Sequence, residues 1–203
     1  MRRRTLRGSL VGALAAALLA PLFTLGCGSG GAATPHRAAD LNNTYLSPAL
    51  SQWLIGAVSR MATAEEVQAY LALRDDAAAT AFIEQFWARR DPDPARAGNP
   101  LLDLFAQREK DADRRFSEAG YLGRRTDRGR VFVLYGEPKK IDFEINPREG
   151  NPPVERWSYG VEAQPGLDRR RPAPIYRFVK NGDLTVFYTL PLSQRGTLLE
   201  PPG

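Results

Sequence analysis

The sequence predicts an α+β fold, with helices in the first part of the domain packed on a small antiparallel β-sheet in the second. Across residues 48–120, apolar residues recur at spacings of three and four, as on one face of a helix. Across residues 126–192, short apolar runs are bounded by glycine and proline, as in an antiparallel meander. Because the helices come first and the strands afterwards, the order favours α+β over alternating strands and helices.

The first two helices are predicted from an apolar face and a capping motif. The first is expected to begin near Pro48. The second should follow Thr63, whose hydroxyl can accept a hydrogen bond from the amide of Glu66 while the Glu66 carboxylate reaches back to residue 63. The apolar face of the first helix consists of Leu50, Trp53, Leu54, Ala57 and Val58.

The third and fourth helices are marked by polar caps and prolines. Asp75 or Asp76 can cap the third helix, and Pro92 prevents its continuation. Asn99 can cap the fourth, with Pro100 at its first position, where a missing N–H costs nothing. We expect the fourth helix to end at Gly120, and its apolar stripe contains one charged residue. That stripe consists of Leu101, Leu104, Phe105, Arg108, Ala112 and Phe116.

Four strands are predicted in the second part of the domain. The run Arg130–Tyr135 is almost wholly apolar and lies between glycines, which is typical of a central strand. Further strands are expected at Val154–Val161, Ile175–Val179 and Leu184–Leu190. The dipeptide at 181–182, Asn-Gly, is typical of a tight hairpin turn between the last two.

The distribution of charge argues against nucleic-acid binding. The chain has 203 residues and a net charge of +5, from 28 lysines and arginines against 23 aspartates and glutamates. Four arginines and no acidic residue lie within residues 1–26, so the rest of the chain is nearly neutral. A basic surface that could hold a polyanion is therefore not expected.

Residues 1–26 have the pattern of a secretory signal peptide. Arginines are followed by an uncharged run, Leu10–Leu25, and then by small residues. The run is shorter than the roughly 20 residues that a membrane-spanning helix needs, and it contains Pro21. We therefore expect this segment to be removed on export.

Cys27 is the only cysteine, so no disulfide can form within the chain. The segment Thr24–Cys27 resembles the lipobox of bacterial lipoproteins, in which the cysteine is acylated and becomes the new N-terminus. The alternative is simple cleavage nearby, for example after Ala33, which would leave a soluble exported protein. Residue 28 is Gly rather than Asp, which favours the outer membrane over the inner. Residues 27–40 are expected to be a flexible tether and residues 41–203 the domain.

Several ordered motifs between Gln52 and about Tyr159 resemble those of a known family. Residues 82–92, FIEQFWARRDP, are similar to the FIxxFWxRRDP signature of the GWxTD-domain family, a group of uncharacterised bacterial proteins. The segment 123–138, GRRTDRGRVFVLYGEP, resembles the one that names the family, with Arg124 in place of the tryptophan. The resemblance implies membership of the family and little about mechanism. Further positions that match are Asn99, Arg108, Ala112 and Phe116, together with Pro153–Tyr159.

Arginines and aspartates within these motifs are the candidate site residues. They could bind a carboxylate or phosphate ligand in a fork geometry, or they could form structural ion pairs that need no ligand, which is the interpretation we favour. Asp127 is also a candidate general acid or base, although Thr126 and Asp127 can instead bond backbone amides and set a turn. The six residues are Arg89, Arg90, Asp91, Arg108, Asp127 and Arg128.

Other kinds of site are not expected. His36 is the only histidine and lies in the predicted tether, which argues against a histidine-based triad or a zinc site. Asp91, Asp93 and Asn99 lack the spacing of a calcium-binding EF-hand loop, so no metal is expected. The chain has no glycine-rich phosphate loop, and we expect no cofactor.

These patterns together predict a lipid-anchored protein of the cell envelope that faces the periplasm. Its domain is expected to be a non-catalytic interaction or scaffold module. Its partners would be the membrane, through the lipid on Cys27, and another envelope protein, with no nucleic acid. The alternative is a ligand-binding or hydrolytic domain that uses the Arg/Asp cluster, with Asp127 as the residue to test.

Overall fold

A computed structural model describes residues 38–146 and 149–189, and the side chains from residue 40 onward. The predicted signal peptide, Cys27 and most of the predicted tether lie outside the described residues. The described residues all belong to one unit of the chain, Ala33–Gly203.

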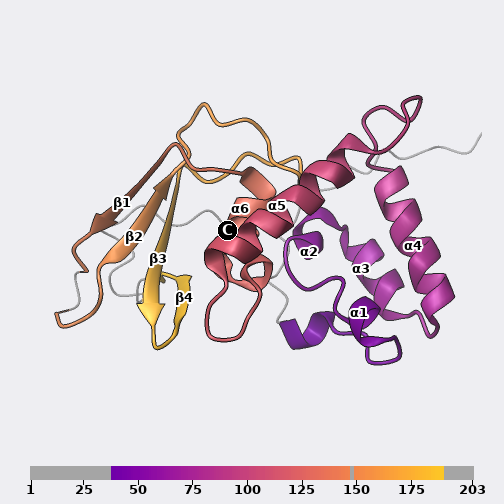
Figure 1. Cartoon of the computed structure of the whole chain (residues 1–203), viewed down its shortest axis with the longest axis horizontal. Coiled ribbons are helices and arrows are strands. Elements are labelled where there is room, and N and C mark those ends of the chain that lie inside the picture. The colour runs from indigo at the N-terminus through magenta and orange to yellow at the C-terminus, as the bar shows by residue number, and fades with distance from the viewer. Residues whose placement is uncertain (1–37, 147–148, 190–203) are drawn as a thin grey trace, which may run out of the picture. The chain divides into compact units, whose positions relative to one another are not determined.

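Helices precede a four-stranded antiparallel sheet, which confirms the predicted α+β class (Figure 1). Two short 3₁₀ helices, η1 and η2, accompany six α-helices. The helical elements are η1 (Ala38–Leu41), α1 (Pro48–Ser51), α2 (Val58–Met61), α3 (Ala64–Leu71), α4 (Asp76–Ala88), α5 (Pro100–Phe116), η2 (Gly123–Arg125) and α6 (Asp127–Tyr135). The strands are β1 (Lys140–Glu144), β2 (Val154–Ser158), β3 (Ile175–Asn181) and β4 (Leu184–Phe187).

The predicted helix caps are confirmed. Thr63 and Glu66 form the reciprocal capping box of α3. The Asp75 carboxylate accepts from the amide of Ala78 at the start of α4. Asn99 caps α5 by accepting from the amides of residues 101 and 102. Each cap satisfies amides that have no partner within the helix.

Two predicted helix boundaries differ in the structure. The first predicted helix is divided into α1 and α2, because Gly56 between them has φ +117, outside the helical region. An added Cβ at Gly56 would lie 3.4 Å from the backbone oxygen of Arg124, so the chain passes close to η2 here. Helix α5 ends at Phe116 rather than at Gly120, because the next residue, Ser117, leaves the helical conformation.

The predicted strand Arg130–Tyr135 is wrong, because these residues form most of helix α6. Thr126 caps this helix by accepting from the amide of Gly129, and Gly136, with φ +77, ends it. Residues 131–134 are all buried, so this half of the helix has no polar face and its sequence shows no helical period. The sheet begins only at Lys140, and its first strand, β1, was not among the predicted strands.

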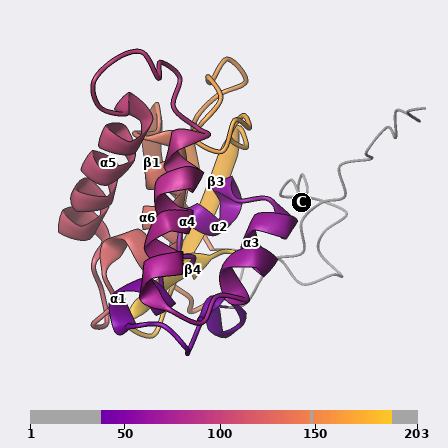
Figure 2. The same cartoon turned by 90° about the vertical axis from the view of Figure 1, so that its right-hand side faces the viewer.

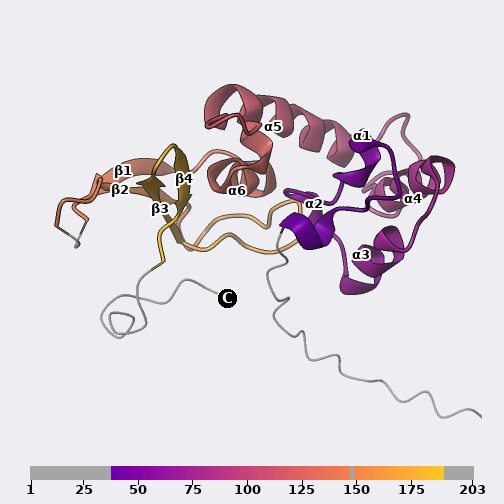
Figure 3. The ribbon, with the colours of Figure 1, turned by 90° about the horizontal axis from the view of Figure 1, so that it is seen from below.

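The sheet has the order β1-β2-β3-β4, with every neighbouring pair antiparallel. Strands β3 and β4 form the hairpin predicted around Asn181, which pairs with Leu184. Helices α5 and α6 lie between the sheet and helices α1–α4, as Figures 1 and 3 show together. Figure 2 shows the same helices from the side of α3 and α4.

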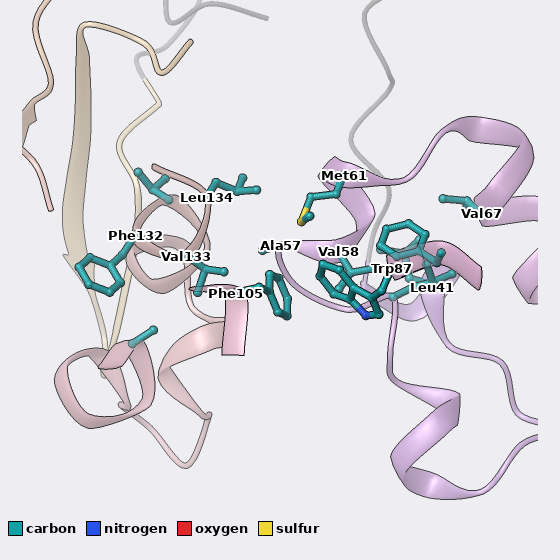
Figure 4. Close-up of a cluster of buried hydrophobic side chains, with 14 of the residues drawn as sticks. Leu41, Ala57, Val58, Met61, Val67, Trp87, Phe105, Phe132, Val133 and Leu134 are labelled. Atoms are coloured by element: carbon teal, nitrogen blue, oxygen red, sulfur yellow. The ribbon is translucent and has the colours of Figure 1, made fainter. Parts of the chain in front are cut away.

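One hydrophobic core runs through the described residues. Trp157 of β2 is fully buried and packs against Phe116 of α5. Nearer the start of α5, the rings of Phe105 and Trp87 have centroids 4.9 Å apart and connect the core to α4 (Figure 4). None of the helices in the described ranges is long and apolar enough to cross a bilayer.

Candidate functional site

Arg89 and Arg90 both bind Glu66 rather than an aspartate of the predicted cluster. The Arg89 guanidinium lies 3.0 Å from Oε1 of Glu66, and the Arg90 guanidinium contacts both Glu66 oxygens. Arg90 also donates to the backbone oxygens of Phe86 and Met61, and it lies over the Phe86 ring. The FIxxFWxRRDP motif therefore attaches the end of α4 to the start of α3.

Two arginines and a helix cap hold the Glu66 carboxylate in its charged form. Burial on its own would raise the pKa of Glu66, but hydrogen bonds from Arg90, from the Thr63 amide and from Arg89 outweigh it and lower the pKa to about 2. The ordinary value is 4.5. The charged form of Glu66 thus stabilises the folded chain above pH 4.5, and this contribution is lost as the pH falls toward 2.

We expect the Glu66→Gln variant to lose less stability in acid than the wild-type chain. A folded-state pKa below the unfolded one contributes about 2 to 3 kcal/mol near neutral pH, allowing for partial exposure to solvent. Glutamine can still fill the capping box, so the variant removes mainly the charge. Urea unfolding at pH 7 and pH 3 should show a smaller difference for the variant; equal differences for the two proteins would contradict this role.

Asp91 and Arg108 do not meet in the structure. The Asp91 carboxylate accepts from the amide of Asp93 and shapes the loop after α4. Arg108 of α5 donates from Nη1 to the backbone oxygens of Val133 and Leu134, at 3.1 and 3.0 Å. These carbonyls lie in the last turn of α6, whose partial negative charge favours a cation. No carboxylate among the described residues forms an ion pair with Arg108.

Asp127 lies at the start of α6 and faces the last strand. Its carboxylate pairs with Arg130 one turn along the helix. Its other oxygen accepts from the backbone amide of Phe187 in β4 at 2.8 Å. Both carboxylate oxygens are therefore engaged, one by a cation and one by the edge of the sheet.

Arg128 connects α6 to the sheet through two glutamates. Its guanidinium lies 3.0 Å from Glu118 and 3.1 Å from Glu155 of β2. Glu118 in turn accepts from the amide and the hydroxyl of Thr185 in β4. Nε of Arg128 is buried without a hydrogen-bond partner. This network fixes the position of the sheet relative to α6.

The six predicted residues therefore belong to separate contact networks rather than to one cluster. Three carboxylates that sequence reasoning missed, Glu66, Glu118 and Glu155, are the partners of Arg89, Arg90 and Arg128. The capping box already singled out Glu66, whereas the other two carry no comparable signal. In the described ranges, no group of three or more histidine, cysteine or acidic side chains could hold a metal.

The segment 123–129 forms a tightly packed junction between α5 and α6. The Thr126 hydroxyl donates to the backbone oxygen of Gly123 and accepts from the amide of Gly129. Gly123 lies directly on the backbone of Ala112, and Gly129 lies on the carbonyl of Gly123, with no room for a Cβ at either glycine. The spacing of glycine, threonine and glycine is thus explained by close backbone packing.

Arg124, which stands where the family has tryptophan, lies on the surface of α5. Its guanidinium pairs with Glu109 at 3.2 Å and with Asp113 at 2.9 Å. Its own amide donates to the Asp113 carboxylate. Arg124 is thus held at this junction by two ion pairs with one helix.

The two edges of the sheet differ. The amides of Thr185 and Phe187 in β4 are bonded by Glu118 and Asp127, so this edge is covered. No hydrogen bond within the described ranges joins the outer edge of β1 to another segment. Ile141 and Phe143 of β1, and Ile145 directly after the strand, alternate with charged residues, and their side chains are 40%, 69% and 94% exposed.

The opposite face of β1 is polar and internally paired. Arg156 of β2 binds the Asp142 carboxylate with two nitrogens, each at 2.6 Å, and also contacts Glu144. Hydrogen bonds from Arg156 hold the pKa of Asp142 far below its usual range. Arg177 of β3 completes the row by binding Glu144. These pairs keep β1 in register with the sheet, while its apolar side chains have no cover.

A pocket of about 410 Å³ lies near the C-terminal end of α6. Arg108 lines it together with Tyr135 and Tyr159, and the loop of residues 163–172 closes one side. Burial raises the pKa of both tyrosines well above the usual value. The Tyr135 hydroxyl donates to Asp168, and that of Tyr159 donates to the carbonyl of Gly136, so both are committed to structural contacts.

The comparisons with known proteins identify the family alone. No curated protein matches the chain, and no solved structure matches it. The model of one family, described as the GWxTD domain, matches residues 37–166, which is more than half of the chain. That range includes α1–α6 and the first two strands. The chain therefore belongs to the GWxTD-domain family.

Proposed function

We propose that this protein is a lipid-anchored component of the bacterial cell envelope and that its GWxTD domain is a non-catalytic interaction module. The observation that carries the proposal is the edge of β1, which is open in the described part of the chain, with exposed Ile141 and Phe143 in the strand and exposed Ile145 directly after it. Natural sheets normally protect their edges with charges, prolines or covering segments. An edge that is both open and apolar is suited to pairing with another chain.

The contrast within the same sheet strengthens this proposal. Carboxylates from α6 and from the segment after α5 occupy the outer amides of β4. The charged side chains of β1 are all in ion pairs. Asp142 binds Lys140 of the same strand and Arg156 of β2, and Glu144 binds Arg156 and Arg177 of β3. The charges of β1 are thus neutralised on one face, and the other face is left apolar.

The partner that fits this edge is an extended segment of another envelope protein, added as a fifth strand. Main-chain hydrogen bonds would supply affinity, and alternating apolar side chains would pack on the face of Ile141, Phe143 and Ile145. Acylation of Cys27 would hold the domain near the membrane, facing the periplasm, and the absence of Asp at residue 28 favours the outer membrane.

The alternative, a ligand-binding or hydrolytic site built from the Arg/Asp cluster, has less support. Asp127 has both oxygens engaged by Arg130 and by the amide of Phe187. Arg128 and Arg90 are bound by glutamates. These contacts favour a structural role for the cluster.

The edge proposal is tested by pull-down from detergent-solubilised membranes with Phe143→Glu. We expect the wild-type chain to recover a stoichiometric protein partner. The variant should recover at least about tenfold less of this partner, since a buried charge at an interface costs more than 1.4 kcal/mol. Val161→Glu is the matched control, because Val161 is 71% exposed against 69% for Phe143 and lies outside β1. Equal loss in both variants, or none in Phe143→Glu, would overturn the edge proposal.

Cys27→Ser separates the anchor from the edge. The variant is expected to leave the membrane fraction and yet to recover the same partner when the partner is supplied in detergent. A variant that stays with membranes would contradict lipidation of Cys27, without bearing on the contact surface at β1.

A further inference from the structure

We propose that the pocket at the C-terminal end of α6 binds a small amphiphilic anion, whose carboxylate or phosphate head lies on Arg108 and whose apolar part lies on the leucines of α5 and of the loop 163–172. This site does not depend on the open edge of β1, and no residue of β1 lines it. Its anchor, Arg108, is the one arginine of the predicted cluster that no carboxylate of the described residues binds.

Arg108 has hydrogen-bonding capacity that the fold does not use. Nη1 is committed to the carbonyls of Val133 and Leu134. Nη2 and Nε make no hydrogen bond in the described part of the chain. Neither nitrogen is a buried atom without a hydrogen-bond partner, so both are accessible from the pocket or from solvent. Nη2 and Nε form the side of the guanidinium that pairs with a carboxylate or phosphate through two parallel hydrogen bonds.

The position of Arg108 is fixed before any ligand arrives. The guanidinium covers Gly136 so closely that a Cβ there would lie 2.9 Å from Nη2. The carbonyl of Leu134 also accepts from the amide of Leu167, which ties the loop to the same helix end. Gly166 packs against Tyr135, where no side chain would fit. A binding group held in this way loses little conformational entropy when a ligand binds.

The charges around the pocket favour an anion. Lys139 and Arg169 also line it, both are exposed, and neither forms an ion pair with any described residue. Glu137, the acidic residue of the lining, is bound by Arg115 of α5. Burial lowers the pKa of Arg108. An anionic head group would supply the missing partner.

The remaining lining is apolar and indicates the other part of the ligand. Leu104 of α5 is exposed on the surface, and Leu101 and Leu167 lie beside it in the lining. Pro165 and Pro172 complete this wall. A pocket of about 410 Å³ is the size of small-molecule sites, so a short acyl or alkyl chain fits it better than a whole lipid.

The test is an NMR titration of the full chain with hexanoate, with hexyl phosphate and with vesicles of phosphatidylglycerol. We expect saturable shifts of the backbone amides of Gly136, Gly166 and Leu167. In Arg108→Met the affinity should fall at least about tenfold, as expected when a charge-assisted pair is lost. Arg114→Met is the matched control on the same helix, since Arg114 is largely exposed and outside the lining.

Two further variants keep the test decisive if Arg108→Met folds poorly. Arg108→Lys preserves the charge but not the paired N–H donors of the guanidinium, so its affinity for the probes should lie between those of the wild-type chain and Arg108→Met. Lys139→Gln leaves all contacts of Arg108 intact and should weaken binding a few-fold. Shifts with the soluble probes support a free ligand, and Arg108-dependent shifts with vesicles alone support a membrane lipid as the source. Absence of saturable shifts with all three probes, or binding that Arg108→Met does not change, would overturn the site.

Discussion

Gly123→Ala is expected to prevent stable folding of the domain. A Cβ at this position would lie 1.9 Å from the backbone oxygen of Ala112, 2.6 Å from its carbonyl carbon and 2.9 Å from Cα of Asp113. All three atoms belong to the backbone of α5, so no change of side-chain rotamer can relieve the overlap. Either η2 or α5 must move, although the two elements pack tightly on each other.

The movement would also break the contacts that depend on this junction. The carbonyl of Gly123 accepts from the Thr126 hydroxyl, and a Cβ on Gly129 would lie 1.8 Å from that same carbonyl. Separating η2 from α5 therefore disturbs the cap of α6 as well. We expect a loss of more than about 4 kcal/mol, which is a large part of the stability of an ordinary domain.

Gly120→Ala is the control for this prediction. Gly120 has φ +79, but an added Cβ meets nothing within 4 Å, so only the strain of the left-handed conformation is introduced. That strain costs about 1 to 2 kcal/mol. Urea unfolding followed by tryptophan fluorescence should show a cooperative transition for Gly120→Ala and none, or one at much lower urea, for Gly123→Ala. A smaller loss for Gly123→Ala than for the control would mean that η2 does not pack on α5 in this way.

Local signals predicted the helical part of the fold well. Caps depend on residues two or three positions apart, so Thr63 with Glu66, Asp75 and Asn99 could be recognised in the sequence alone. The same logic failed for α6, since a short helical run that is wholly buried, as residues 131–134 are, resembles a buried strand. From the sequence, its cap, Thr126, is expected in a turn.

The first strand was missed for the opposite reason. Residues 140–145 alternate charged and apolar side chains, which is the pattern of a strand with one polar face. That signal was present, but the sheet was expected to begin with Arg130–Tyr135. With Arg130–Tyr135 expected as the first strand, the sequence does not identify β1 or the open edge on which the proposed function rests.

The site could be predicted in its residue types but not in its pairings. Arg89, Arg90, Arg108 and Arg128 are all candidate site residues in the sequence, and each makes specific polar contacts. Which group each one meets depends on tertiary packing over separations such as that between Arg128 and Glu155. Sequence spacing cannot distinguish an aspartate partner from a glutamate or from the carbonyls of a helix end.

Trp157→Ala is expected to cost about 3 to 5 kcal/mol, because it removes the largest side chain that the structure buries completely. The indole lies between the rings of Phe116 and Phe178, with centroid distances of 5.4 and 5.1 Å. Phe116 belongs to α5 and Phe178 to β3, so the cavity would open at the contact between helix and sheet. The indole N–H also donates to Glu155, the partner of Arg128.

Trp157→Phe separates the two contributions of the indole. Phenylalanine keeps an aromatic ring between Phe116 and Phe178 but loses the N–H bond to Glu155 and part of the volume. We expect it to cost about 1 to 2 kcal/mol. A cost for Trp157→Ala below that of Trp157→Phe would contradict the packing at this position. If Trp157→Ala instead unfolds the sheet while α1–α4 keep their amide protection, the contact at Trp157 joins two separately cooperative parts of the domain.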